Sequence, residues 1–345
     1  MEFTRILIRA TNWLGDAVVS LPALRAVRER YPAAHIAVQA RPWVAGLYAR
    51  ETFLDRVIPY TAAKGASDWT GKWQAARRLR ADRFDCAILL PNSFDSALVV
   101  RLAGIPRRIG YDRDGRRLLL TDPVPPPLPG EIPRHERFYY LEMLRRAGIL
   151  SALPECPVIG LEGVEAARIV GARRLEQAGI RTPIIGVSPG AAFGGAKRWL
   201  PERFAEAAAQ LAAVTGSALA VFGSKDERPI CETVVRGVEA AGFTAHNFAG
   251  ETSLGEFIDL LAACRVFLTN DSGAMHVAAA LDVPTVAVFG ATDHEGTGPA
   301  GRRVRVVREP VDCSPCLLRE CPTDHRCMTR VSVERVAAAA LELLK

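Results

Sequence analysis

The chain has 345 residues, of which 49% are hydrophobic and 24% are charged, a composition typical of globular proteins and unlike that of disordered or fibrous chains. Its 44 Lys and Arg exceed its 38 Asp and Glu by only six, too small a surplus to indicate a nucleic-acid-binding protein. Only five of those cations are lysine, so arginine dominates, a residue that binds phosphate and carboxylate groups bidentately. The length predicts about two domains.

Membrane-spanning and secreted proteins are disfavoured by the distribution of charge. No uncharged apolar run reaches the length of a membrane span, and Glu2, Arg5 and Arg9 around a short apolar run are unlike a signal peptide. We therefore expect a cytoplasmic protein, whose eight cysteines are thiols or metal ligands rather than disulfides.

Short apolar runs alternate with helical patterns in the first part of the chain. This alternation predicts strands at 5–9, 35–40, 55–60 and 84–91, with helices at 16–31, 69–81 and 93–103 between or after them. A second series begins at 183. Its strands are expected at 184–188, 218–223, 265–270 and 285–290, and its helices at 201–215, 226–241, 254–264 and 274–281.

Two such series predict an α/β protein with two parallel sheets, each covered by helices on both faces. Between them, 123–133 holds six prolines and is expected to form an extended loop. A helix at 136–147 and a linker at 153–163 follow, so we place the domains at 1–160 and 161–345. The last helix, 333–344, is expected to pack back on the first domain.

Ligands of open parallel sheets bind at the carboxyl ends of the strands, and three motifs follow such ends. The first, 11–16, joins the first strand to a helix and contains Gly15 and Asp16. Asp16 has two interpretations: it caps the helix, or its carboxylate acts as a general base.

The second motif, 188–199, combines Gly190, Gly194 and Gly195 with Lys197. Such a loop suits backbone N–H groups that face phosphate oxygens, although a plain glycine-rich turn with a solvated lysine is the alternative. It is not a P-loop, because alanine stands where the lysine is required. It is not a hydrolase elbow either, because Pro189 has no N–H to donate to an oxyanion.

The third motif, 269–276, again joins a strand to a helix. Ser272 and Gly273 stand where free N–H groups at a helix start form an anion site, and His276 follows one turn later. Asp271 beside a phosphate would be repulsive unless it binds a hydroxyl or balances a positive charge. This combination points to a sugar diphosphate. Neither unit opens with the glycine pattern of dinucleotide oxidoreductases.

Four cysteines are clustered before the last helix, with His325 among them. Four thiols within fifteen residues suit one tetrahedral zinc or iron ion of structural role, whereas free thiols or redox-sensitive pairs are the alternatives. The clustered cysteines are Cys313, Cys316, Cys321 and Cys327.

The three motifs, in this order and spacing, resemble those of the lipopolysaccharide heptosyltransferases of glycosyltransferase family 9. The resemblance runs from about residue 6 to 344, and the segments 90–98 and 103–111 are most similar to the type II members. It implies a GT-B architecture, with two Rossmann-like domains facing across a cleft. It also implies inverting transfer of heptose from ADP-heptose to the heptosyl-Kdo-lipid A core of lipopolysaccharide, with no cofactor required for catalysis.

The resemblance also implies roles for the residues of the motifs. Asp16 would deprotonate the acceptor hydroxyl. Lys197 and the N–H groups of Ser272 and Gly273 would hold the diphosphate, within a donor site that includes Gly190. Asp271 and His276 would contact the heptose or the diphosphate.

An acceptor site is expected in the first domain, where arginines are dense between 101 and 117. Asn92, Ser93, Arg107 and Arg108 are the candidates for binding the phosphates and carboxylates of the core, and a solvated basic face is the alternative. A lipid-linked acceptor implies transient contact with the cytoplasmic face of the inner membrane, yet no amphipathic anchor stands out in the sequence.

Three other functions remain as alternatives. A family 9 transferase with another acceptor is the nearest, followed by a nucleotide-sugar epimerase or dehydrogenase, which would hold a nicotinamide. A metal-stabilised nucleic-acid-binding protein would account for the cysteines and arginines but leaves the three motifs unexplained. We therefore expect no nucleic acid among the partners.

Overall fold

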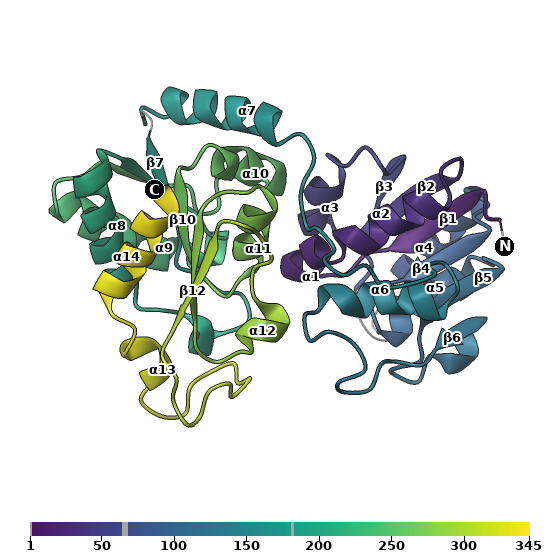
Figure 1. The fold of residues 1–345 in the computed structure, drawn as a ribbon. Helices are drawn as coiled ribbons and strands as arrows, with labels where there is room; N and C mark the ends of the chain where they lie inside the picture. The colour runs from purple at the N-terminus through teal and green to yellow at the C-terminus, as the bar shows by residue number, and fades with distance from the viewer. Residues whose placement is uncertain (1, 64–67, 181–182) are drawn as a thin grey trace. The chain divides into compact units, whose positions relative to one another are not determined.

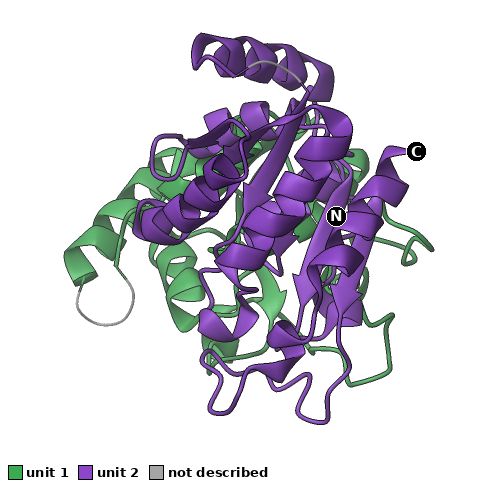
Figure 2. Cartoon of the chain, turned by 90° about the vertical axis from the view of Figure 1, so that its left-hand side faces the viewer, with its two compact units in different colours: residues 1–158 green, residues 159–345 purple. Residues whose placement is uncertain are grey.

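A computed structural model describes residues 2–63, 68–180 and 183–345. The chain forms two compact units, residues 1–158 and 159–345, shown in two colours in Figure 2. This division lies two residues from the predicted boundary. No helix in the described ranges is long and apolar enough to cross a membrane.

Unit 1 is built on a six-stranded sheet in the order β3-β2-β1-β4-β5-β6, and all its neighbouring strands are parallel. The strands are β1 (Arg5–Arg9), β2 (His35–Ala40), β3 (Arg56–Pro59), β4 (Cys86–Leu89), β5 (Arg107–Tyr111) and β6 (Asp122–Val124). The helices are α1 (Leu14–Val19), α2 (Leu21–Arg30), α3 (Pro42–Tyr48), α4 (Trp69–Ala81), α5 (Phe94–Leu102) and α6 (Arg137–Arg146). Helix α2 packs against α6, and α4 packs against α5.

The single helix predicted at 16–31 is two helices, α1 and α2, that meet at Ser20. Pro22 stands at the start of α2, where its missing N–H costs nothing because the first N–H groups of a helix have no intrahelical partner. The break therefore follows from the proline, which is tolerated at a helix start and not inside one.

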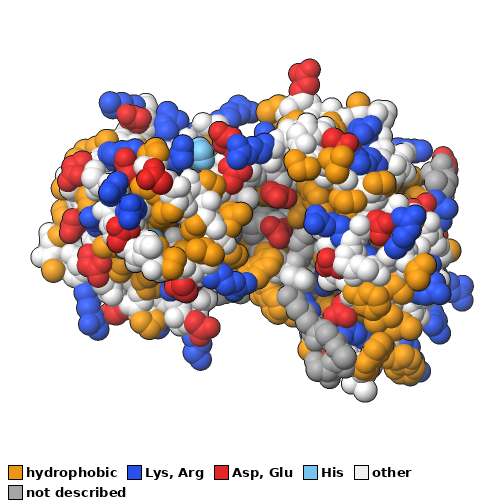
Figure 3. All heavy atoms as spheres, turned by 90° about the horizontal axis from the view of Figure 1, so that it is seen from below, with side chains coloured by type: hydrophobic (Ala, Val, Ile, Leu, Met, Phe, Trp, Pro, Cys, Tyr) orange, Lys and Arg blue, Asp and Glu red, His pale blue; other side chains and the backbone are white. Residues whose placement is uncertain are grey.

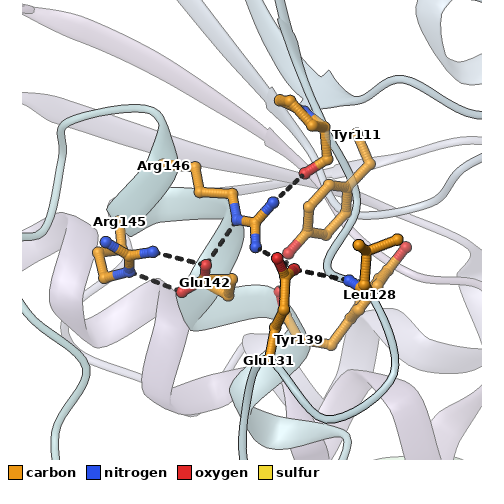
Figure 4. Close-up of polar contacts among 8 residues, drawn as sticks. Tyr111, Leu128, Glu131, Tyr139, Glu142, Arg145 and Arg146 are labelled. Atoms are coloured by element: carbon orange, nitrogen blue, oxygen red, sulfur yellow. Dashed lines mark hydrogen bonds and ion pairs between the residues drawn. The ribbon is translucent and has the colours of Figure 1, made fainter.

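The proline-rich loop after β6 is tied to α6 by a cluster of charged side chains (Figure 4). Glu142 is buried and accepts hydrogen bonds from Arg145 at 2.7 Å and from Arg146 at 2.6 Å. Arg146 also reaches Glu131 at 2.7 Å, and Glu131 accepts from the backbone N–H of Leu128. Hydrogen bonds from the two arginines lower the pKa of Glu142, so the cluster is ionised at neutral pH.

Unit 2 has a second six-stranded parallel sheet, in the order β12-β11-β10-β7-β8-β9. Figure 1 shows α8, α9 and α14 on one side of this sheet and α10, α11 and α12 on the other. The strands are β7 (Ile184–Ser188), β8 (Ala218–Val221), β9 (Ala245–Asn247), β10 (Val266–Asn270), β11 (Thr285–Phe289) and β12 (Val304–Arg308). The helices are α7 (Val164–Gln177), α8 (Pro201–Thr215), α9 (Arg228–Ala240), α10 (Leu254–Ala262), α11 (Gly273–Ala280), α12 (His294–Thr297), α13 (Arg326–Thr329) and α14 (Val333–Leu344).

The short helices α12 and α13 were not predicted, and two longer helices of unit 2 also differ from the expectations. Helix α14 has the predicted bounds, but it packs on α8 and on the sheet of its own unit rather than returning to unit 1, because Val336 and Ala340 complete the core there. Helix α7 lies in a region where no helix was expected, and it packs against α10. Gly171 makes this approach possible, since a Cβ there would lie 1.9 Å from the carbonyl oxygen of Asp259.

Candidate active site

The carboxyl edge of the unit 1 sheet carries the candidate base. Asp16 is exposed in the first turn of α1, directly after β1, and Asn92 and Ser93 follow β4, the neighbour of β1. The residue at the N-cap position of α1 is Trp13, so the interpretation of Asp16 as a helix cap is wrong. Its carboxylate lies in the first turn of α1, at the carboxyl edge of the sheet.

Residues of α6 and of the turn before it interact electrostatically with Asp16, and the sequence did not single them out. Desolvation by neighbouring atoms, followed by the negative charge of Asp16, raises the pKa of Glu136. Burial raises the pKa of Tyr140, and Asp16 adds to that rise. Asp16 thus lies among groups that stay protonated above their usual pH range.

A buried arginine supports the turn that leads to Asp16. Arg9, the last residue of β1, donates to the carbonyl oxygens of Ala10 at 2.8 Å and Gln39 at 3.1 Å, and to the side chain of Asn12. Its guanidinium lies 4.4 Å from the ring centroid of Tyr60, and burial lowers the pKa of Arg9 to about 10. The only signal in the sequence was an arginine at the end of a strand whose central residues, 6–8, are apolar.

The two predicted acceptor residues that follow β4 have partners within unit 1. The side-chain amide of Asn92 donates to the hydroxyl of Tyr139 at 2.9 Å. Ser93 is the N-cap residue of α5, and its carbonyl oxygen accepts from the hydroxyl of Ser96 at 2.6 Å. Both lie at the same edge as Asp16, and their role in acceptor binding stays a prediction.

Arg107 and Arg108 lie at the opposite edge of that sheet. They begin β5, where Arg107 pairs with Cys86 at the start of β4, whereas Asp16 follows the end of β1. Arg107 forms an ion pair with Asp122. Arg108 is buried and donates to the carbonyl oxygens of Ile105 and Leu119, and burial lowers its pKa. This placement argues against an acceptor role for either arginine, and that role stays a prediction.

In unit 2, the carboxyl ends of β7 and β10 bring the second and third motifs together. The Nζ atom of Lys197 lies 2.6 Å from Oδ2 of Asp271, and both side chains are largely buried. The same carboxylate oxygen accepts a hydrogen bond from the hydroxyl of Thr292. Asp271 therefore balances a positive charge, one of the two conditions under which a carboxylate is compatible with a phosphate site.

Asn270, the last residue of β10, connects the two motifs, and the sequence interpretation did not give it a role. Its side-chain oxygen Oδ1 accepts from the backbone N–H of Trp199 at 2.9 Å, and its side-chain NH2 group donates to the carbonyl oxygen of Pro189 at 2.7 Å. The residue is fully buried. The sequence signal for this role was an asparagine at the end of a buried strand. A buried side-chain amide needs hydrogen-bond partners, so it connects the segments around it.

The start of α11 presents backbone N–H groups beside this ion pair. Ser272 is the N-cap residue, and its side chain does not cap the helix but lies 3.2 Å from the hydroxyl of Thr269. Gly273 is the first residue of α11, and His276 is buried one turn later. Gly190 faces Glu227, whose carboxylate would lie 2.2 Å from a Cβ at that position. Phosphate oxygens suit the N–H groups at such a helix start.

All four clustered cysteines line one pocket of about 80 Å³, together with His325. Three hydrogen bonds hold the segment 319–325 against the turn that carries Lys197. Gly194 permits this close approach, because a Cβ there would collide with the carbonyl group of Arg319. Among the described residues, no group of three or more His, Cys, Asp or Glu is arranged to hold a metal ion, so the zinc or iron site stays a prediction. The three bonds are Ala196 N–H to Arg319 O, Gly195 N–H to Glu320 Oε1, and His325 Nε2 with Ala196 O.

A family model of glycosyltransferase family 9 (heptosyltransferase) matches residues 72–326. The chain belongs to glycosyltransferase family 9. It is 34% identical over 311 residues to lipopolysaccharide heptosyltransferase 2 of Salmonella typhimurium, a match that covers 88% of each chain.

Two solved structures of this family are similar over nearly the whole chain. ADP-heptose lipopolysaccharide heptosyltransferase II of Escherichia coli superposes with a TM-score of 0.82 at 31% identity, covering 99% of this chain and 98% of that one. A family 9 transferase of Veillonella parvula superposes with a TM-score of 0.83 at 23% identity, covering 99% and 97%. The two parallel sheets are thus those of the GT-B fold, and the chain is a glycosyltransferase. The epimerase, dehydrogenase and nucleic-acid alternatives gain no support.

Proposed function

We propose that this family 9 enzyme transfers L-glycero-D-manno-heptose, with inversion, from ADP-heptose to the heptosyl-Kdo-lipid A inner core of lipopolysaccharide. The observation that carries the proposal is the Lys197–Asp271 ion pair beside the start of α11, which suits the diphosphate of a nucleotide sugar. The full-length similarity to heptosyltransferases of type 2 supports the choice of heptose as the sugar.

Unit 2 would stabilise the leaving group. As the bond between heptose C1 and the diphosphate oxygen breaks, negative charge develops on ADP. The N–H groups of Ser272 and Gly273 and the ammonium of Lys197 would neutralise it. Asp271, which accepts a hydrogen bond from Thr292, holds that ammonium in position. Removing one such fixed donor typically costs on the order of 3 kcal/mol of transition-state stabilisation.

Asp16 would supply the base. The acceptor hydroxyl attacks C1 from the side opposite to ADP, a new C–O bond forms, and the hydroxyl proton moves to the Asp16 carboxylate. A positioned general base contributes roughly 100- to 10,000-fold in rate. This scheme uses side chains and backbone N–H groups of the protein alone.

Incubation with ADP-heptose and defined core acceptors, followed by mass spectrometry, tests the proposal. A product heavier by one heptose, with ADP release that depends on the acceptor, is expected. Asp16→Asn should lower kcat at least about 100-fold while ADP-heptose binding persists. Glu29→Gln, at an exposed site of α2, is the matched control and should keep full activity. Full activity of Asp16→Asn would disprove the assigned base.

The acceptor carries lipid chains, so we also propose that the enzyme acts at the cytoplasmic face of the inner membrane, in transient contact with it.

A further proposal concerns the cysteine-lined pocket, where Cys313, Cys316, Cys321 and Cys327 supply the thiolate donor set that zinc and iron prefer. Metal analysis of protein purified without added zinc should find about one equivalent of zinc or iron. Substoichiometric amounts of both would overturn this assignment.

A further inference from the structure

The positive charge of the chain resides in one of its two units. Residues 1–158 carry 24 Lys and Arg and 16 Asp and Glu, and therefore have a formal charge of +8. Residues 159–345 carry 20 Lys and Arg and 22 Asp and Glu, and therefore have a formal charge of −2. Unit 1 is thus the part of the protein that an anionic surface would attract.

Exposed aromatic side chains also gather in unit 1. Four of the five tryptophans of the chain belong to it and are each more than half exposed, whereas Trp199 of unit 2 is fully buried. In the right-hand part of Figure 3, which holds unit 1, hydrophobic side chains lie at the surface next to lysine and arginine side chains. The four exposed tryptophans are Trp13, Trp43, Trp69 and Trp73.

Helix α4 combines both features. Trp69 and Trp73 are 56% and 57% exposed, one helical turn apart, and the guanidinium of Arg77, a further turn on, lies 5.6 Å from the ring centroid of Trp73. Arg78 is exposed beside them, and no acidic residue occurs between 69 and 81. The buried side of α4 holds Lys72, which meets Asp95 of α5 at 3.4 Å. This helix therefore has a firmly packed inner side and an aromatic, basic outer side.

The helix stands at the edge of unit 1 where the acceptor is expected. Because a helix that follows a parallel strand runs back along the sheet, the first turns of α4, with both tryptophans, lie toward the carboxyl edge. Asp16 and Asn92 follow strands at that same edge. A surface that bound the α4 tryptophans would lie on the side from which a lipid-linked acceptor reaches Asp16.

We propose that the outer side of α4 docks on an anionic lipid bilayer, with Trp69 and Trp73 inserted at the headgroup level and Arg77 and Arg78 beside anionic headgroups. The proposal rests on the proposed function, because only a lipid-linked acceptor requires such contact. Tryptophan is enriched where one end of a side chain is apolar and the other is wet, and arginines beside it are attracted by anionic lipids. The absence of acidic residues from α4 favours a bilayer over a basic protein partner.

Co-sedimentation of the full-length protein with vesicles tests this proposal. Vesicles of phosphatidylcholine with phosphatidylglycerol should bind the protein at least about tenfold more strongly than phosphatidylcholine alone, with a blue shift of tryptophan fluorescence. The double variant Trp69→Ala/Trp73→Ala, and separately Arg77→Gln/Arg78→Gln, should each lose most of that binding. The matched control is Ile169→Ala/Val170→Ala, an exposed apolar pair on α7, which should bind like the wild type.

Transfer assays separate this proposal from the proposed function. The tryptophan double variant should keep wild-type transfer to a deacylated, water-soluble acceptor and lose transfer to the lipid-linked acceptor in vesicles. Equal loss with both acceptors, or wild-type binding that is the same for neutral and anionic vesicles, would overturn the docking role of α4. Absence of heptose transfer to any acceptor would instead overturn the proposed function, and vesicle binding by the wild type would still be measurable.

Discussion

The Nζ atom of Lys197 lies 2.6 Å from Oδ2 of Asp271, although the two residues come from different motifs 74 positions apart. This ion pair explains why a carboxylate, that of Asp271, can stand next to the start of α11, where the backbone N–H groups suit a phosphate. The ammonium balances the charge of Asp271 and is held by it, so a bound diphosphate would meet a cation that is already in place. In the proposed mechanism, Asp271 would therefore position Lys197.

Replacing Lys197 with methionine keeps the length of the side chain and removes its charge. Because the charge is needed mainly as ADP leaves, we expect kcat/KM for ADP-heptose to fall about 100-fold or more, with the larger part in kcat. Steady-state ADP release at saturating acceptor measures both constants. Arg236→Met, which removes an exposed cation from α9, is the control and should change neither. A change confined to KM would show that Lys197 contributes only to ground-state binding.

Replacing Arg108 with alanine should damage the fold rather than acceptor binding. The buried carbonyl group of Ile105 and the partly buried one of Leu119 would lose their donor, which costs about 2 kcal/mol or more. We expect a lower Tm and an unchanged KM for the acceptor in the folded fraction. Arg113→Ala, at an exposed site just after the carboxyl end of β5, should show the reverse: an unchanged Tm and a KM raised several-fold. If Arg108→Ala raised the KM for the acceptor and left Tm unchanged, the predicted role of Arg108 in acceptor binding would be right.

The sequence predicted those elements whose buried faces are large and apolar. Strands β1, β2 and β7 have the predicted bounds because buried parallel strands are short apolar runs. Helix α7 escaped notice because its buried positions are Ala167, Gly171 and Leu175, so close packing replaces a periodic pattern of large apolar residues.

The residues proposed for the site could be named from the sequence, but the contacts between them could not. Motif order identified Asp16, Lys197 and Asp271, since each follows the carboxyl end of a strand. The ion pair between the last two depends on strands β7 and β10 being neighbours, which no local pattern encodes. Strand β5 begins with two arginines and has no apolar alternation, so the placement of Arg107 at the opposite edge became visible only through its register with Cys86.

Gly171→Ala should destabilise unit 2 even though alanine is the better helix former. In an exposed helix this change would stabilise by up to about 1 kcal/mol. Here the new Cβ would lie 1.9 Å from the carbonyl oxygen of Asp259, so α7 must move away from α10 at a cost of about 1–3 kcal/mol. Thermal unfolding measures the effect, and Val170→Ala, an exposed site on the same helix, should leave Tm unchanged. A raised Tm for Gly171→Ala would contradict the close packing of the two helices.

The link between Glu256 and Arg174 should make the stability of unit 2 depend on pH. Glu256 accepts from the backbone N–H of Ser253 and pairs with Arg174 at 2.5 Å, which lowers its pKa from 4.5 to about 2. Because the folded protein favours the ionised form, this stabilisation is complete above about pH 4.5 and is lost as the pH falls toward about 2. The carboxylate is 41% exposed, so solvent screening limits the effect to about 1 kcal/mol.

Urea unfolding measures this contribution. The variant Glu256→Gln, which keeps the helix cap, should have a lower free energy of unfolding than the wild type at pH 7, and the difference should shrink as the pH falls from about 4.5 toward about 2. Glu176→Gln, at an exposed site of α7, should show no such change, and a deficit of Glu256→Gln that stayed constant with pH would exclude the ion pair as its cause.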